Sequence, residues 1–164
     1  MIKLQNFATA FLKRDGKYLL MKRSAEKKIA PNVWCSVGGH IEEYEMNEPE
    51  AACMREIEEE TGIKGTQVQN LKLRYVIMRR ARDILRQNYV YFGETTAKDL
   101  INTDEGTLHW IPEKELLNRE FTQTFTAMLR HYTETPDCEN IVIGAAHSVD
   151  GKLKMSWSSI RDFD

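Results

Sequence analysis

Three glutamates near the middle of the chain have the residue type and spacing needed to bind a metal ion. They are Glu56, Glu59 and Glu60. At 3.6 residues per turn, their carboxylates fall within about a third of the circumference of a helix. Like charges at this spacing repel each other, and a bound cation relieves the repulsion. Carboxylate oxygens suit Mg²⁺, with Mn²⁺ as a second candidate. The alternative is a solvated helix face, which is the more common origin of a bare run of glutamates.

The segment 48–61 is predicted to be the helix that carries these glutamates. Good helix formers fill it, Asn47 and Glu50 have the spacing of a capping box, and Pro49 stands near the first turn. Gly62 follows the last helical residue, where glycine commonly ends a helix. Both ends of the helix are therefore marked in the sequence.

A Gly38-Gly39 pair precedes the helix by one loop, and glycine allows the backbone to turn tightly or approach a ligand. Together, residues 39–63 resemble the Nudix box of the Nudix hydrolase (MutT-like) family. That pattern is Gly, five residues, Glu, seven residues, then Arg-Glu-U-x-Glu-Glu-x-Gly-U, where U is a bulky aliphatic residue. The matching residues are Gly39, Glu45, Arg55, Glu56, Ile57, Glu59, Glu60, Gly62 and Ile63.

The loop of the box is longer than the family pattern. Nine residues rather than seven separate Glu45 from Arg55, so counting back from Arg55 places Asn47 at the first glutamate position. Counting forward from Gly39 places Glu45 there. The two assignments stay open at this point.

The resemblance implies roles for particular residues. It makes Glu56, Glu59 and Glu60 metal ligands with catalytic roles, together with the backbone carbonyl of Gly38. Arg55 is expected to hold Glu59 one helical turn away. An ordinary surface pair between the two is the alternative.

A further carboxylate is expected from a later loop, a few residues before a tryptophan-bearing strand. Glu105 fits this catalytic role because it stands five residues before Trp110, and its neighbour Asp104 is the rival. Either acid is otherwise a solvated loop residue. The candidate substrate contacts are Lys22 and Arg23 at a strand end, and Gly39. Four further arginines form either a phosphate-binding loop or a solvated turn: Arg79, Arg80, Arg82 and Arg86.

The remaining pattern predicts an α+β fold. Two apolar runs flank the hairpin signal Asp15-Gly16, and later runs alternate as strands do. A short helix is expected at 112–117 and a longer one at 122–132. The resemblance implies a Nudix-type α/β/α sandwich with a mixed β-sheet and the catalytic loop-helix. One domain is expected over 1–164, with the Nudix box at 39–63 and a C-terminal helix and β-hairpin at 121–164.

Composition excludes several classes of partner. A formal net charge of −2 gives no general attraction to nucleic acid or to anionic membranes. The balance of 41% hydrophobic and 29% charged residues is typical of a soluble globular protein. The first residues lack the apolar run of a signal peptide, so a cytoplasmic location is expected. The oligomeric state is left open.

The function implied by the resemblance is Mg²⁺-dependent hydrolysis of a phosphoanhydride bond in a nucleoside diphosphate linked to another group. The products are a nucleoside monophosphate and the phosphorylated remainder. Purine nucleoside triphosphates, including oxidised ones, are the preferred substrate class. Hydrolysis of ADP-ribose or nucleotide sugars, a nucleotide sensor without activity, and an unrelated domain with an acidic helix are the alternatives.

Overall fold

The computed structural model describes residues 1–27, 30–136 and 138–162. The helices are α1 (Pro49–Thr61) and α2 (Gln123–Glu134), with 3₁₀ turns η1 (Glu43–Glu45), η2 (Gly65–Gln67) and η3 (Glu113–Asn118). The strands are β1 (Lys3–Arg14), β2 (Lys17–Arg23), β3 (Trp34–Cys35), β4 (Val37–His40), β5 (Val68–Ala81), β6 (Ile84–Thr95), β7 (Gly106–Pro112), β8 (Ile141–Val149) and β9 (Lys152–Ile160).

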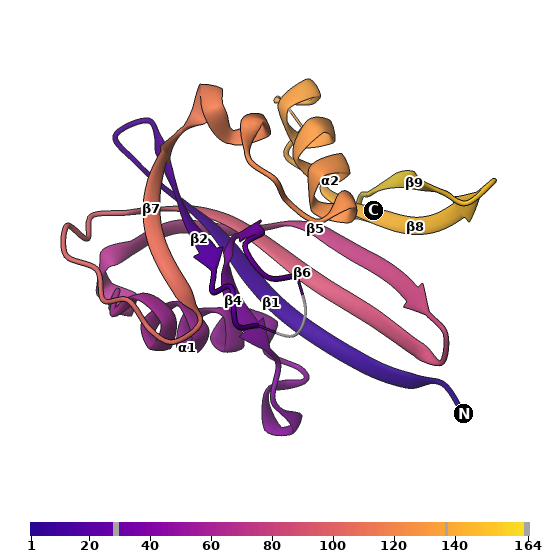
Figure 1. Cartoon of the computed structure of the whole chain (residues 1–164), viewed down its shortest axis with the longest axis horizontal. Coiled ribbons are helices and arrows are strands. Elements are labelled where there is room, and N and C mark those ends of the chain that lie inside the picture. The colour runs from indigo at the N-terminus through magenta and orange to yellow at the C-terminus, as the bar shows by residue number, and fades with distance from the viewer. Residues whose placement is uncertain (28–29, 137, 163–164) are drawn as a thin grey trace.

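Within the described ranges the strands form one mixed sheet. Its order is β3-β2-β1-β6-β5-β8-β9, with β4 paired to β1 and β7 paired to β2. β1 runs parallel to β6 and β5 runs parallel to β8, whereas the other pairs are antiparallel. α1 covers one face of the sheet and α2 covers the other (Figure 1). The expected α+β sandwich is confirmed.

The first hairpin forms where the sequence predicts it. Asp15 and Gly16 both adopt positive φ, at 50° and 72°, which is the conformation of a tight two-residue turn. β1 extends well beyond the expected apolar run and pairs with three strands. The middle of β1, residues 7–10, lies between β4 and β6, so it connects the Gly38-Gly39 segment to the rest of the sheet.

Two expected helices differ in detail from the structure. The residues expected as a short helix at 112–117 form the 3₁₀ turn η3 after Pro112, and α2 begins after Thr122 and ends at Glu134. The predicted N-terminal capping box of α1 is wrong. Glu48 is the N-cap residue and makes no side-chain cap hydrogen bond, so α1 begins at Pro49, where proline needs no hydrogen-bond partner for its nitrogen.

Two apolar clusters lie on opposite faces of the sheet. The cluster beneath α1 contains mostly aliphatic and small side chains, among them Leu12, Val37, Cys53 and Ile57. The cluster beneath α2 contains mostly aromatic and large side chains, among them Phe11, Tyr75, Phe92, Leu116 and Met128.

The chain after α2 adds a second hairpin to the sheet. β8 and β9 are joined by Asp150-Gly151, again with positive φ at both residues, as the sequence predicts. Gly144 of β8 lies against the Trp157 ring of β9, where a side chain would overlap the ring. Among the described helices, neither is long and apolar enough to cross a bilayer. That residues 1–164 form one domain stays a prediction.

Candidate active site

Helix α1 presents its glutamates at the edge of a cleft because its opposite side is fixed to the sheet. Ala52, Cys53 and Ile57 are fully buried beneath it. The helix ends at Gly62, which has φ of 76° and donates its N–H to the Glu58 carbonyl. A left-handed residue at this position is typical of helix C-termini and is least strained for glycine.

The Gly38-Gly39 pair brings the backbone of β4 against the carboxylates of α1. The Gly38 N–H donates a 2.7 Å hydrogen bond to Oε2 of Glu60. A Cβ atom on Gly38 would overlap the Ala8 carbonyl of β1, and one on Gly39 would overlap the Glu56 carboxylate. Gly38 therefore requires glycine, because it meets backbone and has φ of 135°, whereas a side chain at Gly39 would displace the Glu56 carboxylate.

Arg55 connects the loop to the helix. Its Nε and Nη2 donate to the two Glu45 carboxylate oxygens at 2.8 and 2.9 Å, a bidentate pair. Its Nη1 lies 2.9 Å from Glu56 Oε1 and 3.0 Å from Glu59 Oε2. Nη2 also donates to the His40 carbonyl at 3.0 Å. The expected contact with Glu59 is present, and Glu45 is the stronger partner that sequence reasoning left unresolved.

The loop length now has a physical explanation. The turn η1 folds Glu45 back so that its Oε2 accepts the Glu42 N–H at 3.1 Å, and Glu45 is buried, with 8% of its surface exposed. The Arg55 guanidinium beside it lowers the pKa of the Glu45 carboxyl. Glu45 is therefore the loop acid that contacts Arg55, and the longer loop is accommodated before α1 begins.

Two half-buried carboxyl groups of α1, Glu56 and Glu60, are not fully compensated. Burial raises the pKa of Glu60 to about 7, although its hydrogen bond from the Gly38 backbone acts in the opposite direction. Burial also raises the pKa of Glu56, against the lowering effect of Arg55. A buried carboxylate whose pKa is raised gains stability from a nearby cation. The two groups thus have the electrostatic character of a cation site.

The donor set fits a hard divalent cation, although its side chains are not gathered around one point. Within the described residues, no three acidic, histidine or cysteine side chains have the arrangement of metal ligands. Arg55 explains this, because its Nη1 bonds to both Glu56 and Glu59. Arg55 bonds to one oxygen of each carboxylate, Oε1 of Glu56 and Oε2 of Glu59, so the second oxygen of each is not engaged by Arg55.

The three glutamates line one cleft of about 750 Å³, which we call the carboxylate cleft. Gly38, Gly39 and Glu105 line it as well, whereas Asp104 does not. Glu105 Oε1 lies 2.6 Å from Nζ of Lys27, which ties the loop acid to the segment after β2. Of the two rival loop acids, Glu105 is therefore the one placed beside the α1 carboxylates.

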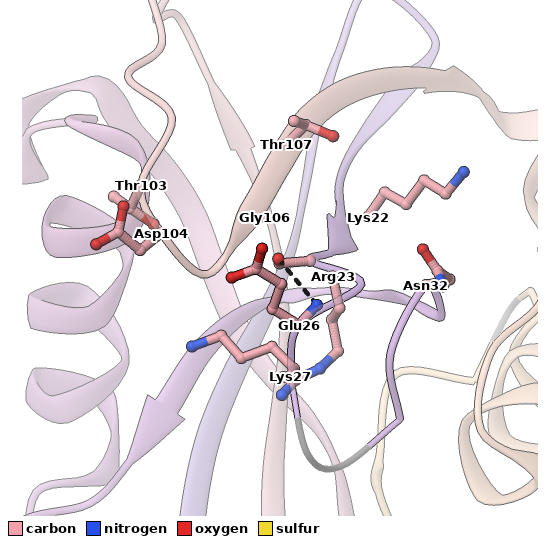
Figure 2. Close-up of a pocket in the computed structure, with 10 residues that line it drawn as sticks. Lys22, Arg23, Glu26, Lys27, Asn32, Thr103, Asp104, Gly106 and Thr107 are labelled. Carbon is pink, nitrogen blue, oxygen red and sulfur yellow. Dashed lines mark hydrogen bonds between the residues drawn. The ribbon is translucent and has the colours of Figure 1, made fainter.

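A second cleft of about 700 Å³ adjoins the first. We call it the basic cleft because Lys22, Arg23 and Lys27 line it (Figure 2). Lys22 and Arg23 point in different directions from the end of β2 (Figure 2), as neighbouring strand residues do. Arg23 lines both clefts, and its buried Nε has no hydrogen-bond partner among the described residues. Lys22 lines only the basic cleft.

The sequence did not reveal the end of the carboxylate cleft that lies away from the basic cleft, which we call the far end. Gln5 and Asn88 line it there, together with Arg86 from the predicted arginine cluster. The signal that brings them together is the parallel pairing of β1 with β6. Neither strand carries a residue pattern that identifies its partner strand, so these positions emerge only from the structure.

Comparison with known proteins identifies the family. The NUDIX domain matches residues 3–132. The fold resembles a crystal structure of the mutator MutT protein from Bacillus halodurans, with a TM-score of 0.73 and 17% identity over 93% of this chain and 97% of that chain. It also resembles the MutT protein from Methanosarcina mazei Go1, with a TM-score of 0.70 and 17% identity over 84% and 98% of the two chains. For the MutT NUDIX hydrolase from Burkholderia pseudomallei the TM-score is 0.64, with 24% identity over 78% and 97%. The chain belongs to the Nudix family of pyrophosphohydrolases.

Proposed function

We propose that this enzyme hydrolyses nucleoside diphosphates linked to another group, and that purine nucleoside triphosphates, including oxidised ones, are its preferred class. The observation that supports this most is one cleft lined by the α1 glutamates, the Gly38-Gly39 backbone and Glu105, with a basic cleft beside it. The negative charge of the carboxylate cleft suits a metal ion, and the positive charge of the basic cleft suits phosphate groups.

Enzymes of this family generally need a divalent metal, and we propose Mg²⁺, with Mn²⁺ as a substitute. Glu56, Glu59, Glu60 and the Gly38 carbonyl would hold it, because they offer the hard oxygen ligands that both ions prefer. The metal would neutralise charge on the bridging phosphates and lower the pKa of a bound water.

The protein's own residues orient the reacting groups. Arg55 fixes the rotamers of Glu56 and Glu59 while it is anchored by Glu45, so it acts as a positioning residue. Glu105 enters the cleft from a different segment than the helical glutamates. Its carboxylate accepts a proton from water. Gly39 leaves room for the Glu56 carboxylate next to the backbone.

The basic cleft supports a triphosphate as substrate. Lys22 and Arg23 would bind the phosphates beyond the cleaved bond, and Arg23 reaches both clefts. The guanidinium of Arg23 has the forked donors that match phosphate oxygens, and it lies where the two clefts meet. A substrate lying across both clefts would place its phosphoanhydride bridge near the α1 carboxylates.

A nucleotide screen tests this proposal. The purified enzyme is incubated with purine triphosphates and their 8-oxo forms, pyrimidine triphosphates, ADP-ribose and nucleotide sugars, with Mg²⁺, Mn²⁺ or EDTA. Products are separated by ion-exchange chromatography. The expected result is metal-dependent release of a nucleoside monophosphate and pyrophosphate, fastest with a purine triphosphate. Faster cleavage of ADP-ribose or a nucleotide sugar would replace the substrate class, and binding without turnover would favour a nucleotide sensor.

A further inference from the structure

The far end of the carboxylate cleft is built from alternate residues of two parallel strands. In the pairing of β1 with β6, Gln5 stands opposite Arg86 and Phe7 stands opposite Asn88. All four line the cleft. Thr9, two residues beyond Phe7, stands opposite Gly38, which bonds to Glu60. Four residue steps of β1 separate Thr9 from Gln5, or about 13 Å. A ribose and a base can lie along this length.

Arg86 offers hydrogen-bond donors there without a carboxylate partner. Its Nε donates to Oε1 of Gln5 at 2.9 Å, which fixes the plane of the guanidinium. The ion pairs of the described residues all involve other cations. Its cross-strand neighbour on β5 is Arg79, and like charges in this position destabilise a sheet. The terminal amino groups of Arg86 are therefore available to a ligand rich in acceptors.

The walls of this end suit a planar, uncharged group more than a phosphate. The ring centroids of Phe7 and His40 lie 4.2 Å apart, and Phe125 adds apolar surface to the cleft. Aromatic and apolar walls favour a base, whereas the adjoining basic cleft offers Lys22 and Arg23 for phosphates.

We propose that Arg86, oriented by Gln5 and assisted by Asn88, selects the acceptor edge of an unoxidised guanine base. This inference rests on the proposed function. Guanine presents two acceptors, N7 and O6, to a forked donor, whereas adenine presents one acceptor and one donor. Oxidation at C8 converts N7 into an N–H donor that faces the guanidinium. GTP is therefore favoured over both ATP and 8-oxo-GTP.

The test compares two arginines on the same face of the β5–β6 hairpin. Arg86→Met and Arg79→Met remove the same charge from paired positions, but only Arg86 lines the cleft. We would measure kcat/KM with GTP, 7-deaza-GTP, which lacks only the N7 acceptor, ATP and 8-oxo-GTP. We expect the unsubstituted enzyme and Arg79→Met to prefer GTP over each of the others by about tenfold. Arg86→Met should remove most of this preference, because kcat/KM should fall more with GTP, which offers two acceptors, than with ATP, which offers one.

The outcomes separate this inference from the proposed function. Equal use of GTP and 7-deaza-GTP by the unsubstituted enzyme overturns the guanine assignment, while the observed hydrolysis keeps the proposed function. Equal losses with every nucleotide in both arginine variants also overturn it, because they indicate general attraction of an anion. Turnover of no nucleotide with either metal contradicts the proposed function, and the base assignment with it.

Discussion

The side of the sheet covered by α1 carries charge where the side covered by α2 carries aromatic rings. Arg55 contacts three glutamates on the first side, and the half-buried Glu60 has a raised pKa. On the second side, Phe92 is stacked between Phe11 at 5.0 Å and Tyr132 at 4.0 Å. The first arrangement holds charged groups in place for a ligand, and the second buries apolar area.

This difference separates two kinds of mutational effect. Like charges close together oppose folding unless an opposite charge compensates them, so the α1 side depends on Arg55 and on a ligand. Stacked rings stabilise the fold directly through apolar burial and ring geometry. Substitutions of the carboxylates around Arg55 should therefore change activity more than stability, and substitutions in the aromatic cluster beneath α2 should do the reverse.

The largest effect is expected from Glu59→Gln, which keeps the side-chain shape and removes one negative charge from the cleft. We expect kcat to fall on the order of a hundred- to a thousandfold, the range for loss of one group that stabilises transition-state charge. Thermal unfolding should change little because Glu59 is exposed. Glu58→Gln is the matched control, since Glu58 pairs with Lys64 at 2.6 Å and does not line the cleft. Similar turnover in the two variants would remove Glu59 from the site.

A smaller loss is expected when the loop acid is neutralised. Glu105→Gln should lower kcat by about a hundredfold with a weaker effect on KM, because proton transfer is needed mainly in the transition state. Asp104→Asn should remain near the unsubstituted rate, since Asp104 lines the basic cleft instead. Steady-state kinetics of both variants decide the assignment. A crippled Asp104→Asn beside an active Glu105→Gln would move the role by one residue.

The sequence predicted the α1 side well because its information is local. The spacing of Glu56, Glu59 and Glu60 fixes one helical face, and Gly62 fixes the end of the helix. The predicted N-terminal cap of α1 was wrong because contacts made by the preceding loop determine where this helix begins. Once Glu45 is bound to Arg55, the chain enters α1 through Glu48 without a side-chain cap.

The far end of the cleft was beyond sequence reasoning for a different reason. Gln5 and Arg86 are separated by 81 positions and meet only through a parallel strand pair. Parallel pairing depends on the whole crossover between two strands, and no short motif records it. Arg86 therefore looked like the other arginines of its cluster, although the structure gives it a different environment from Arg79.

On the α2 side, we expect Phe92→Leu to lower stability and leave activity nearly unchanged. Leucine fills part of the volume but loses both ring stacks, so the free energy of unfolding should fall by about 1–2 kcal/mol. Tyr132→Phe keeps the stack and removes only the hydroxyl group near Tyr18, so its loss should be smaller. Urea denaturation and kcat are measured for both variants. A large fall in kcat for folded Phe92→Leu would contradict the separation of the two sides.

The smallest effect is a pH dependence of stability from His131 on the α2 side. Burial lowers the pKa of this imidazole, whereas Glu134 on the same helix acts in the opposite direction. The Tyr75 hydroxyl lies 2.9 Å from its Nδ1, and the Trp157 ring lies 4.5 Å away. Because the folded-state pKa is below the unfolded value of about 6.5, the unfolded chain binds a proton first as the pH falls. The stabilisation from the neutral imidazole is complete above about pH 6.5, and it is lost as the pH falls through the folded-state pKa. It amounts to about 1.4 kcal/mol for each pKa unit between the folded and unfolded states.

Urea denaturation at pH 7.5, 6.5, 5.5 and 4.5 in EDTA should therefore show that the free energy of unfolding falls more steeply with decreasing pH in the unsubstituted protein than in His131→Gln. His147→Gln, at an exposed position of β8, should keep the steep profile. Parallel profiles for His131→Gln and the unsubstituted protein would show that this ring is not the source, and would point instead to Glu45, whose lowered pKa also makes protonation oppose folding.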